Sequence, residues 1–355
     1  MKGDSMKSVY TACFTPTLMV AFAMLASAQQ TANAPKSAQK SAPAENERPL
    51  VMTGSVPLEG LKGGFDHFAS GGGRVFVAAR SVGVLVFTAN GGAFQTIPVP
   101  APQGIVFSPE ANKLFVGSAR GKLHIFDGSS YKPITTIDFQ GGADNLRYDA
   151  ATKRVYVGCG DNEKTGAIAA VDATTNKRLD EEYKLGDEPE SFQLEKSGPN
   201  IYVNVRGLKQ IAVINRTTKA ITRWTLNGLA LNFPMALDEA DHRLFIGTRE
   251  PPRLAVFDTR TGRMVAALPT VVDADDLYYD ADRRRIYMPG AEGFINVFQM
   301  IDPDHYQLYA KVATGPGART AGFFGSAGKD QTRFYSAVPA YGNQGAEIRV
   351  YTVLN

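Results

Sequence analysis

Short runs of alternating apolar and polar residues recur along most of this chain, and no helical period is long enough to predict a helix of consequence. The stretch NKLFVGSARGKLHIFD (112–127) and the stretch HRLFIGTREPPRLAVFD (242–258) share one plan. Each has an aromatic strand, a turn that contains an arginine, and a second strand that ends in Phe-Asp. Alternation bounded by turn residues predicts β-strands, and recurrence of the plan predicts a structural repeat.

Five further copies of this strand pair lie elsewhere in the chain. Aligning all seven on their first aromatic residue gives intervals of 39, 41, 46, 43, 42 and 48 residues. The aligned aromatics are Phe76, Phe115, Tyr156, Tyr202, Phe245, Tyr287 and Tyr335. A strand precedes each pair and a fourth follows it, often after a turn such as DATTN or DTRTG. Four antiparallel strands repeated at this spacing predict an all-β fold, a seven-bladed β-propeller.

The last copy ends with AEIRVYTVLN at residue 355, directly after its third strand. The segment PLVMTGSVPL (49–58) precedes the first blade and alternates as a strand should. We therefore expect this N-terminal strand to complete the last blade and close the ring, which removes two exposed sheet edges.

Units such as LFVGSARGKLHIFD resemble the YVTN-type propeller repeats of bacteria, the exported YncE-like group in particular. The resemblance covers residues 50–355, and the Tyr-Val-Thr-Asn motif survives only in degenerate form, as YVNV at 202–205. It implies the propeller scaffold and leaves the chemistry open, because propellers host binding proteins and enzymes alike.

Residues 1–28 have the features of a secretory signal peptide: early lysines, a short apolar stretch, and a small-residue end at Ala26-Ser27-Ala28. Residues 29–48 are rich in Ala, Pro, Gln and Lys, which predicts a flexible linker before the propeller at 49–355. No later stretch is apolar enough to predict a transmembrane segment. We expect a periplasmic or secreted, monomeric protein.

Charge and cysteine content exclude few functions. Residues 1–48 hold five of the 38 basic and three of the 35 acidic residues, which leaves 33 against 32 in the propeller. This balance lacks the basic excess of a dedicated nucleic-acid binder. Only Cys159 remains after the signal peptide, so no disulfide within the chain is expected. No phosphate-binding loop, dinucleotide fingerprint or nucleophile elbow is present, and no cofactor is expected.

The residues that begin the first strand of each module should ring the propeller axis. They are polar in every blade, and a wet central channel is the simplest reason. These positions include Asp66, His67, Gln103, Asp144, Asn145, Glu190, Asn232, Asp275, Asp276 and Arg319. The candidates for ligand binding among them are Asp144, Asn145, Glu190, Asn232, Asp275 and Arg319.

Four arginines follow the aligned aromatic by four or five residues, on the face of that ring. They are Arg80, Arg120, Arg206 and Arg249. Guanidiniums gathered there suit recognition of carboxylate or phosphate. Pairing with acidic residues of neighbouring blades is the structural alternative.

His67 is the only histidine at an axial position. With Asp66 and Arg319 it forms a candidate acid–base group, since histidine titrates near neutrality. Tetrahedral zinc needs clustered His or Cys, which the chain does not offer, and no loop has calcium-ligand spacing, so no metal is expected.

These observations favour a noncatalytic binding or scaffold protein whose arginine-bearing face recognises an anionic ligand, peptide, glycan or nucleic-acid strand. The competing hypothesis is a lactonase-like hydrolase or isomerase with its site at the axial mouth. It rests on analogy, because lactonases share the seven-bladed architecture.

Overall fold

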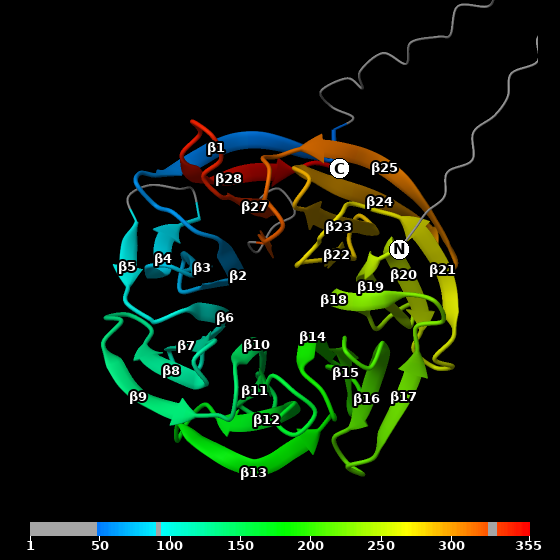
Figure 1. The fold of residues 1–355 in the computed structure, drawn as a ribbon, viewed down its shortest axis with the longest axis horizontal. Coiled ribbons are helices and arrows are strands. Elements are labelled where there is room, and N and C mark those ends of the chain that lie inside the picture. Colours follow the sequence, from blue (N-terminus) through cyan, green and yellow to red (C-terminus); the bar gives the residue numbers. More distant parts are fainter. Residues whose placement is uncertain (1–47, 90–93, 326–331) are drawn as a thin grey trace, which may run out of the picture. The chain divides into compact units, whose positions relative to one another are not determined.

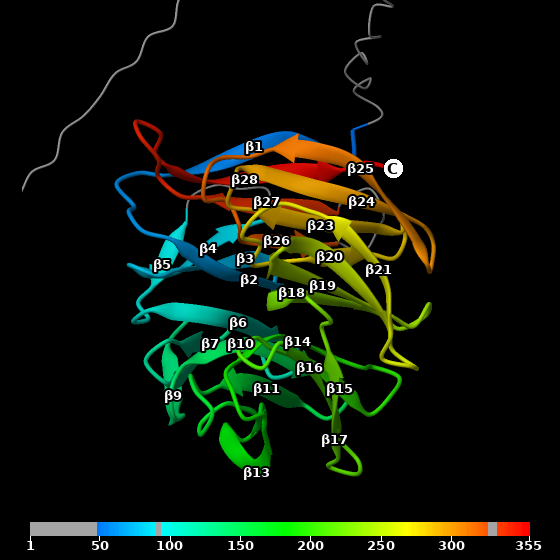
Figure 2. The ribbon, with the colours of Figure 1, turned by 45° about the vertical axis from the view of Figure 1, so that its right-hand side comes forward.

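The computed structural model describes residues 48–89, 94–325 and 332–355. Within them the chain forms seven four-stranded antiparallel sheets arranged in a ring, with no helix (Figures 1 and 2). The predicted seven-bladed β-propeller is confirmed. The expected signal peptide, and the expected linker up to residue 47, lie outside the described residues. The described part contains no helix that could cross a membrane.

Each sheet runs from an inner strand near the axis to an outer strand at the rim. The inner strands are β2 (Phe65–Gly71), β6 (Pro102–Ser108), β10 (Ala143–Asp149), β14 (Pro189–Leu194), β18 (Ala230–Asp238), β22 (Tyr278–Asp280) and β26 (Ala321–Phe324). The second strands are β3 (Arg74–Ala79), β7 (Lys113–Ser118), β11 (Arg154–Cys159), β15 (Asn200–Val205), β19 (Arg243–Glu250), β23 (Arg285–Gly290) and β27 (Arg333–Val338).

The remaining strands lie farther from the axis. The third strands are β4 (Gly83–Thr88), β8 (Lys122–Asp127), β12 (Ala167–Asp172), β16 (Gln210–Asn215), β20 (Pro252–Asp258), β24 (Phe294–Asp302) and β28 (Ala346–Val353). The outer strands are β5 (Gln95–Ile97), β9 (Pro133–Asp138), β13 (Lys177–Lys184), β17 (Ile221–Thr225), β21 (Met264–Pro269), β25 (His305–Ala313) and β1 (Leu50–Leu58).

The aligned aromatics that revealed the repeat all lie in second strands and are at most 1% exposed. They pack between neighbouring blades: Phe76 lies in one cluster with Phe107 of the next blade, and Tyr335 lies in one with Phe87. Burying an aromatic of this size stabilises the fold by about 1.5–3 kcal/mol. The repeat therefore encodes the contacts that hold blade to blade.

The turns into several outer strands follow the expected chemistry. In the turn after β12, Asp172 accepts hydrogen bonds from the backbone N–H groups of Thr174 and Thr175 at 2.8 Å. The last turn residue, Asn176, has φ of 60°, a left-handed conformation that asparagine tolerates better than most residues. Asp258 makes the equivalent bonds before Gly262, whose φ is 70°.

Five inner strands change their pairing register close to their N-terminal ends. The shifts fall between Phe65 and Phe68, Pro102 and Ile105, Ala143 and Leu146, Pro189 and Phe192, and Asn232 and Met235. Each shift leaves two consecutive residues outside the regular pairing. Such β-bulges redirect side chains and are common beside functional sites.

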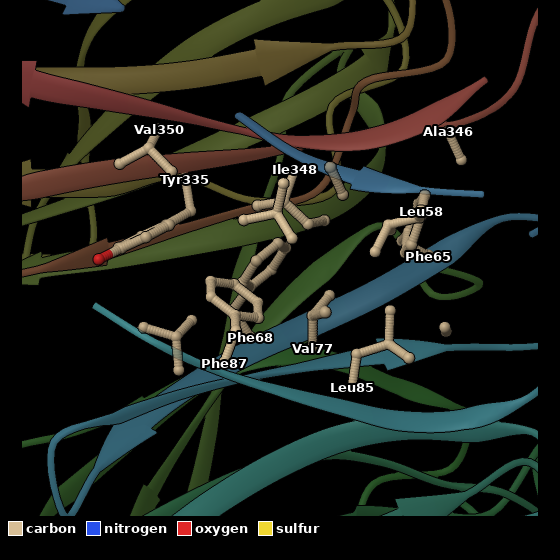
Figure 3. Packing of buried hydrophobic residues seen from close by; sticks show 14 residues of the cluster. Leu58, Phe65, Phe68, Val77, Leu85, Phe87, Tyr335, Ala346, Ile348 and Val350 are labelled. Carbon is tan, nitrogen blue, oxygen red and sulfur yellow. The ribbon is translucent and has the colours of Figure 1, made fainter. Parts of the chain in front are cut away.

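The N-terminal strand completes the last blade, as the sequence predicts. β1 pairs antiparallel with β28, from Leu50 opposite Val353 to Leu58 opposite Ala346. Figure 3 shows the core at this closure, where Leu58, Ile348 and Tyr335 of the last blade meet the first blade.

The closing strand supplies the first stability prediction. Leu58 is 1% exposed, so Leu58→Ala should lower the free energy of unfolding by about 2–5 kcal/mol, measured by urea denaturation. Met52 lies on the same strand but is 48% exposed, so Met52→Ala should cost less than about 0.5 kcal/mol. Equal effects of the two substitutions would contradict the closing role of β1.

Candidate functional site

The axial ends of the inner strands surround a cavity of about 230 Å³, here called the axial mouth. Most of its lining comes from the bulged strands and the arginine-bearing turns. The lining residues are Asp66, His67, Arg80, Gln103, Asp144, Asn145, Glu188, Glu190, Ser191, Arg206, Phe233, Arg249, Asp275 and Arg319. All but Ser191 and Phe233 are charged or carry a side-chain amide, so the mouth is strongly polar.

Arginines of the mouth pair with carboxylates of the first-strand ends. Arg80 Nη2 lies 2.5 Å from Asp66 Oδ2. Arg206 pairs with Glu188 and, at 3.1 Å, with Glu190. Both arginines thus pair with carboxylates of their own blade, whereas the structural alternative had expected partners from neighbouring blades. The pairing also fixes where each guanidinium lies.

Arg249 and Arg319 share two carboxylates. Asp273 lies 2.9 Å from both Arg249 Nε and Arg319 Nη1, and Asp275 pairs with the same two guanidiniums. The two arginines come from different blades, so this four-membered network ties the fifth blade to the loop that enters the seventh.

The ring of Phe233 contacts two of the arginines, Arg206 and Arg249. The guanidinium carbons of Arg249 and Arg206 lie 3.5 Å and 5.2 Å from the centre of the Phe233 ring. Cation–π attraction of this kind contributes about 0.5–1 kcal/mol at exposed sites and more when desolvated. Phe233 therefore helps to hold two guanidiniums in fixed positions.

His67 lies among three carboxylates. Its Nδ1 is 3.1 Å from Asp276 Oδ1, and its Nε2 is 3.5 Å from Asp66 Oδ1 and 3.9 Å from Asp144 Oδ1. Burial alone would lower the pKa of His67, but the charges of Asp276, Asp66 and Asp144 outweigh it and raise that pKa to about 10. The imidazole is consequently a cation at neutral pH.

Several carboxyl groups of the mouth resist ionisation. Burial, and next the charge of Asp66, raise the pKa of Asp144 to about 7. Burial also raises the pKa of Glu190 well above its ordinary value and raises the pKa of Asp275. Each of these groups also feels like charge from other carboxylates. Burial, together with like charge from neighbouring carboxylates, thus favours the protonated form of these three groups.

A second cavity, of about 310 Å³, is also lined by His67 and Ser191. Its other lining residues are largely apolar, among them Phe68, Leu146, Met235 and Phe324. Arg147, Gln193 and Asp276 are the exceptions, and Arg147 Nη2 donates to Ser191 Oγ at 3.1 Å. His67 and Ser191 therefore stand at the boundary between a polar and a more apolar space.

The structure gathers most of the expected ligand-binding residues in one place. Arg80, Asp144, Asn145, Glu190, Arg206, Arg249, Asp275 and Arg319 all line the mouth, and so do the acid–base candidates Asp66 and His67. Arg120 does not line it and is exposed in the turn between β7 and β8. Asn232 does not either: it is fully buried and donates to Asn204 Oδ1 and to the Gln210 carbonyl.

Sequence reasoning did not single out Glu188, Phe233 or Asp273. Glu188 and Phe233 are sequence neighbours of axial positions that the repeat had marked, and Asp273 lies two residues before Asp275. Phe233 lies in the β-bulge of β18, directly after Asn232, and a count of module positions does not report that bulge. Glu188 and Asp273 lie in the loops that precede the first strands of their blades, and the bulges do not account for them.

Comparisons with known proteins agree with the fold. No family model matches the chain. Its sequence is 23% identical over 198 residues to a protein called uncharacterized protein YncE from Salmonella typhimurium, and the match covers 53% of each chain. The chain thus spans about half the length of this curated relative. Together with the seven blades, this similarity supports the expected resemblance to YncE-like propellers.

Two solved structures share the architecture. A chain of the mitotic checkpoint complex superposes with a TM-score of 0.70 at 14% identity, covering 96% of this chain and 99% of that one. A chain of hydrazine synthase from Kuenenia stuttgartiensis gives a TM-score of 0.66, also at 14% identity, covering 79% and 96%. At such identities the likeness shows the fold alone.

The raised pKa of Glu190 predicts a pH dependence of stability. A carboxyl whose pKa is higher in the folded state binds more protons there than in the unfolded chain, so stability falls as pH rises above about 4.5. One such group contributes at most about 1.4 kcal/mol per pH unit. Urea denaturation between pH 5 and 8 should therefore show a shallower fall for Glu190→Gln than for the wild type. An equally steep fall would contradict the assignment.

Proposed function

We propose that this YncE-like propeller is an exported, noncatalytic binding protein whose axial mouth takes a small ligand that carries a carboxylate. The proposal of export rests on the signal-peptide features of residues 1–28. The proposal of binding rests on the convergence of Arg80, Arg206, Arg249 and Arg319 on one cavity.

The arginines are suited to bind an anion because they are both positioned and accessible. Carboxylates and the Phe233 ring hold the guanidiniums in place, so little side-chain entropy remains to be lost on binding. The side chains of Arg80 and Arg319 are nevertheless 46% and 32% exposed. A guanidinium has five N–H donors in a planar fork that matches a carboxylate.

The size of the mouth favours a small molecule over a macromolecular strand. Its volume of about 230 Å³ lies below the roughly 300–1,000 Å³ of sites for drug-sized ligands. The carboxylates that surround the arginines would repel a run of phosphates. A peptide, glycan or nucleic acid would therefore have to bind chiefly outside the mouth.

The hydrolase alternative receives less support. A general base must be able to accept a proton near the working pH, and an imidazole with a pKa of about 10 is already protonated there.

Isothermal titration of the full chain with glucuronate tests the proposal, with glucose as the neutral analogue. Glucuronate should bind and glucose should not, because only glucuronate presents a carboxylate. Arg80→Ala and Arg319→Ala should each weaken binding by roughly 10- to 100-fold, the equivalent of one charge-assisted hydrogen bond of about 1.5–3 kcal/mol.

Arg120→Ala is the matched control, because Arg120 occupies the equivalent repeat position but does not line the mouth. Its affinity for glucuronate should equal that of the wild type. Equal binding of glucose and glucuronate, or unchanged affinity in Arg319→Ala, would refute the proposal.

A further inference from the structure

Three side chains from two blades bring potential metal donors together at the floor of the mouth. His67, Asp66 and Asp144 each offer one ligand atom, and these atoms lie within 4.8 Å of one another. The distances from His67 Nε2 to the two carboxylate oxygens are 3.5 Å and 3.9 Å. Donors around a tetrahedral ion with bonds of about 2.0–2.1 Å lie about 3.3 Å apart, so small side-chain shifts would suffice.

The other ring nitrogen of His67 is held as in known metal sites. Nδ1 lies 3.1 Å from Asp276 Oδ1, and Asp276 Oδ2 in turn accepts a hydrogen bond from the Ala321 backbone N–H at 2.8 Å. A carboxylate on the far nitrogen of a metal-binding histidine fixes its tautomer and orientation. The arrangement directs Nε2 toward Asp66 and Asp144.

A buried amide adds an independent observation. Asn145 is only 2% exposed and lines the mouth, yet its Oδ1 has no hydrogen-bond partner among the described residues. Its Nδ2 lies 3.3 Å from Asp144 Oδ2. Leaving a buried amide oxygen unsatisfied costs about 1–3 kcal/mol. A cation beside Asp144 would give this oxygen a partner.

Asp144 is the least well paired carboxylate of the three around His67. Asp66 also pairs with Arg80, and Asp276 lies 3.1 Å from His67 Nδ1, whereas Asp144 has His67, at 3.9 Å, as its one ion-pair partner among the described residues. Buried carboxylates at this density are stable when they are paired or coordinate a metal.

We propose that His67, Asp66 and Asp144, with Asn145 Oδ1 as a further donor, bind a divalent transition-metal ion at the floor of the axial mouth. One imidazole with carboxylate and amide oxygens suits Mn²⁺ or Zn²⁺ better than Mg²⁺ or Ca²⁺, which prefer oxygen alone. The Nε2 proton of the imidazolium leaves when the ion binds. The inference does not depend on the carboxylate ligand proposed above.

The test is titration of the chelator-treated full chain with Mn²⁺ and with Zn²⁺, in a non-coordinating buffer without any carboxylate. The wild type should bind one ion per chain, and the ion should raise the melting temperature by mass action. Asp144→Asn removes a ligand charge at nearly constant shape and should weaken binding by at least about 10-fold. Asp276→Asn leaves the three proposed ligands in place but removes the carboxylate that holds His67 Nδ1, and it should weaken binding by roughly 10- to 100-fold.

Asp273→Asn is the matched control, because Asp273 pairs with Arg249 and Arg319 and with none of the proposed ligands. It should bind both ions as the wild type does, and melting without metal verifies that each variant folds. Three results would overturn the site: no binding at millimolar ion, wild-type affinity in Asp144→Asn, or equal binding of Mn²⁺ by wild type and His67→Asn. A negative result here leaves the glucuronate experiment to be judged separately.

Discussion

The pairing of β1 with β28 is the constraint on which the rest of the structure depends. It joins residues about 300 positions apart in sequence and fixes the ring at seven blades. Once the ring is closed, the inner strands converge on the axis and surround the axial mouth. Most residues that line the mouth are charged, and its arginines and carboxylates pair with one another.

The β-bulges of five inner strands place side chains in the lining of the mouth. At each bulge two consecutive residues leave the regular alternation, and residues of every one line the mouth: Asp66 and His67 on β2, Asp144 and Asn145 on β10. The resulting side chains are rigid because guanidiniums, carboxylates and one aromatic ring hold one another. A site organised in this way favours selective binding of a small charged ligand, since little ordering remains to oppose association.

The fold was largely predictable and the site only in part, for one physical reason. Repeated aromatic positions such as Tyr156 and Phe245 report blade-to-blade packing, which every module needs, so the blade number and the closing strand follow from them. A module position also fixes where a backbone lies, which is why Asp66, Asp144 and Arg319 could be expected to meet.

A module position does not fix the direction in which a side chain points. Asn232 turns into the protein and braces Asn204, whereas Arg120 stays exposed in a short turn. The proposed cation ligands come from two blades. Asp144 is far in sequence from Asp66 and His67, so no local spacing marks the three as a set.

We propose that the charged groups of the axial mouth form the binding site of this protein. A crystal structure of the full chain grown with Mn²⁺ and glucuronate would test this proposal. We expect an anomalous manganese peak at His67 Nε2 and the Asp66 and Asp144 carboxylates, with the sugar carboxylate against Arg80 or Arg319. Manganese and glucuronate bound only at the rim of the blades or on the opposite face, with the mouth filled by water, would contradict it.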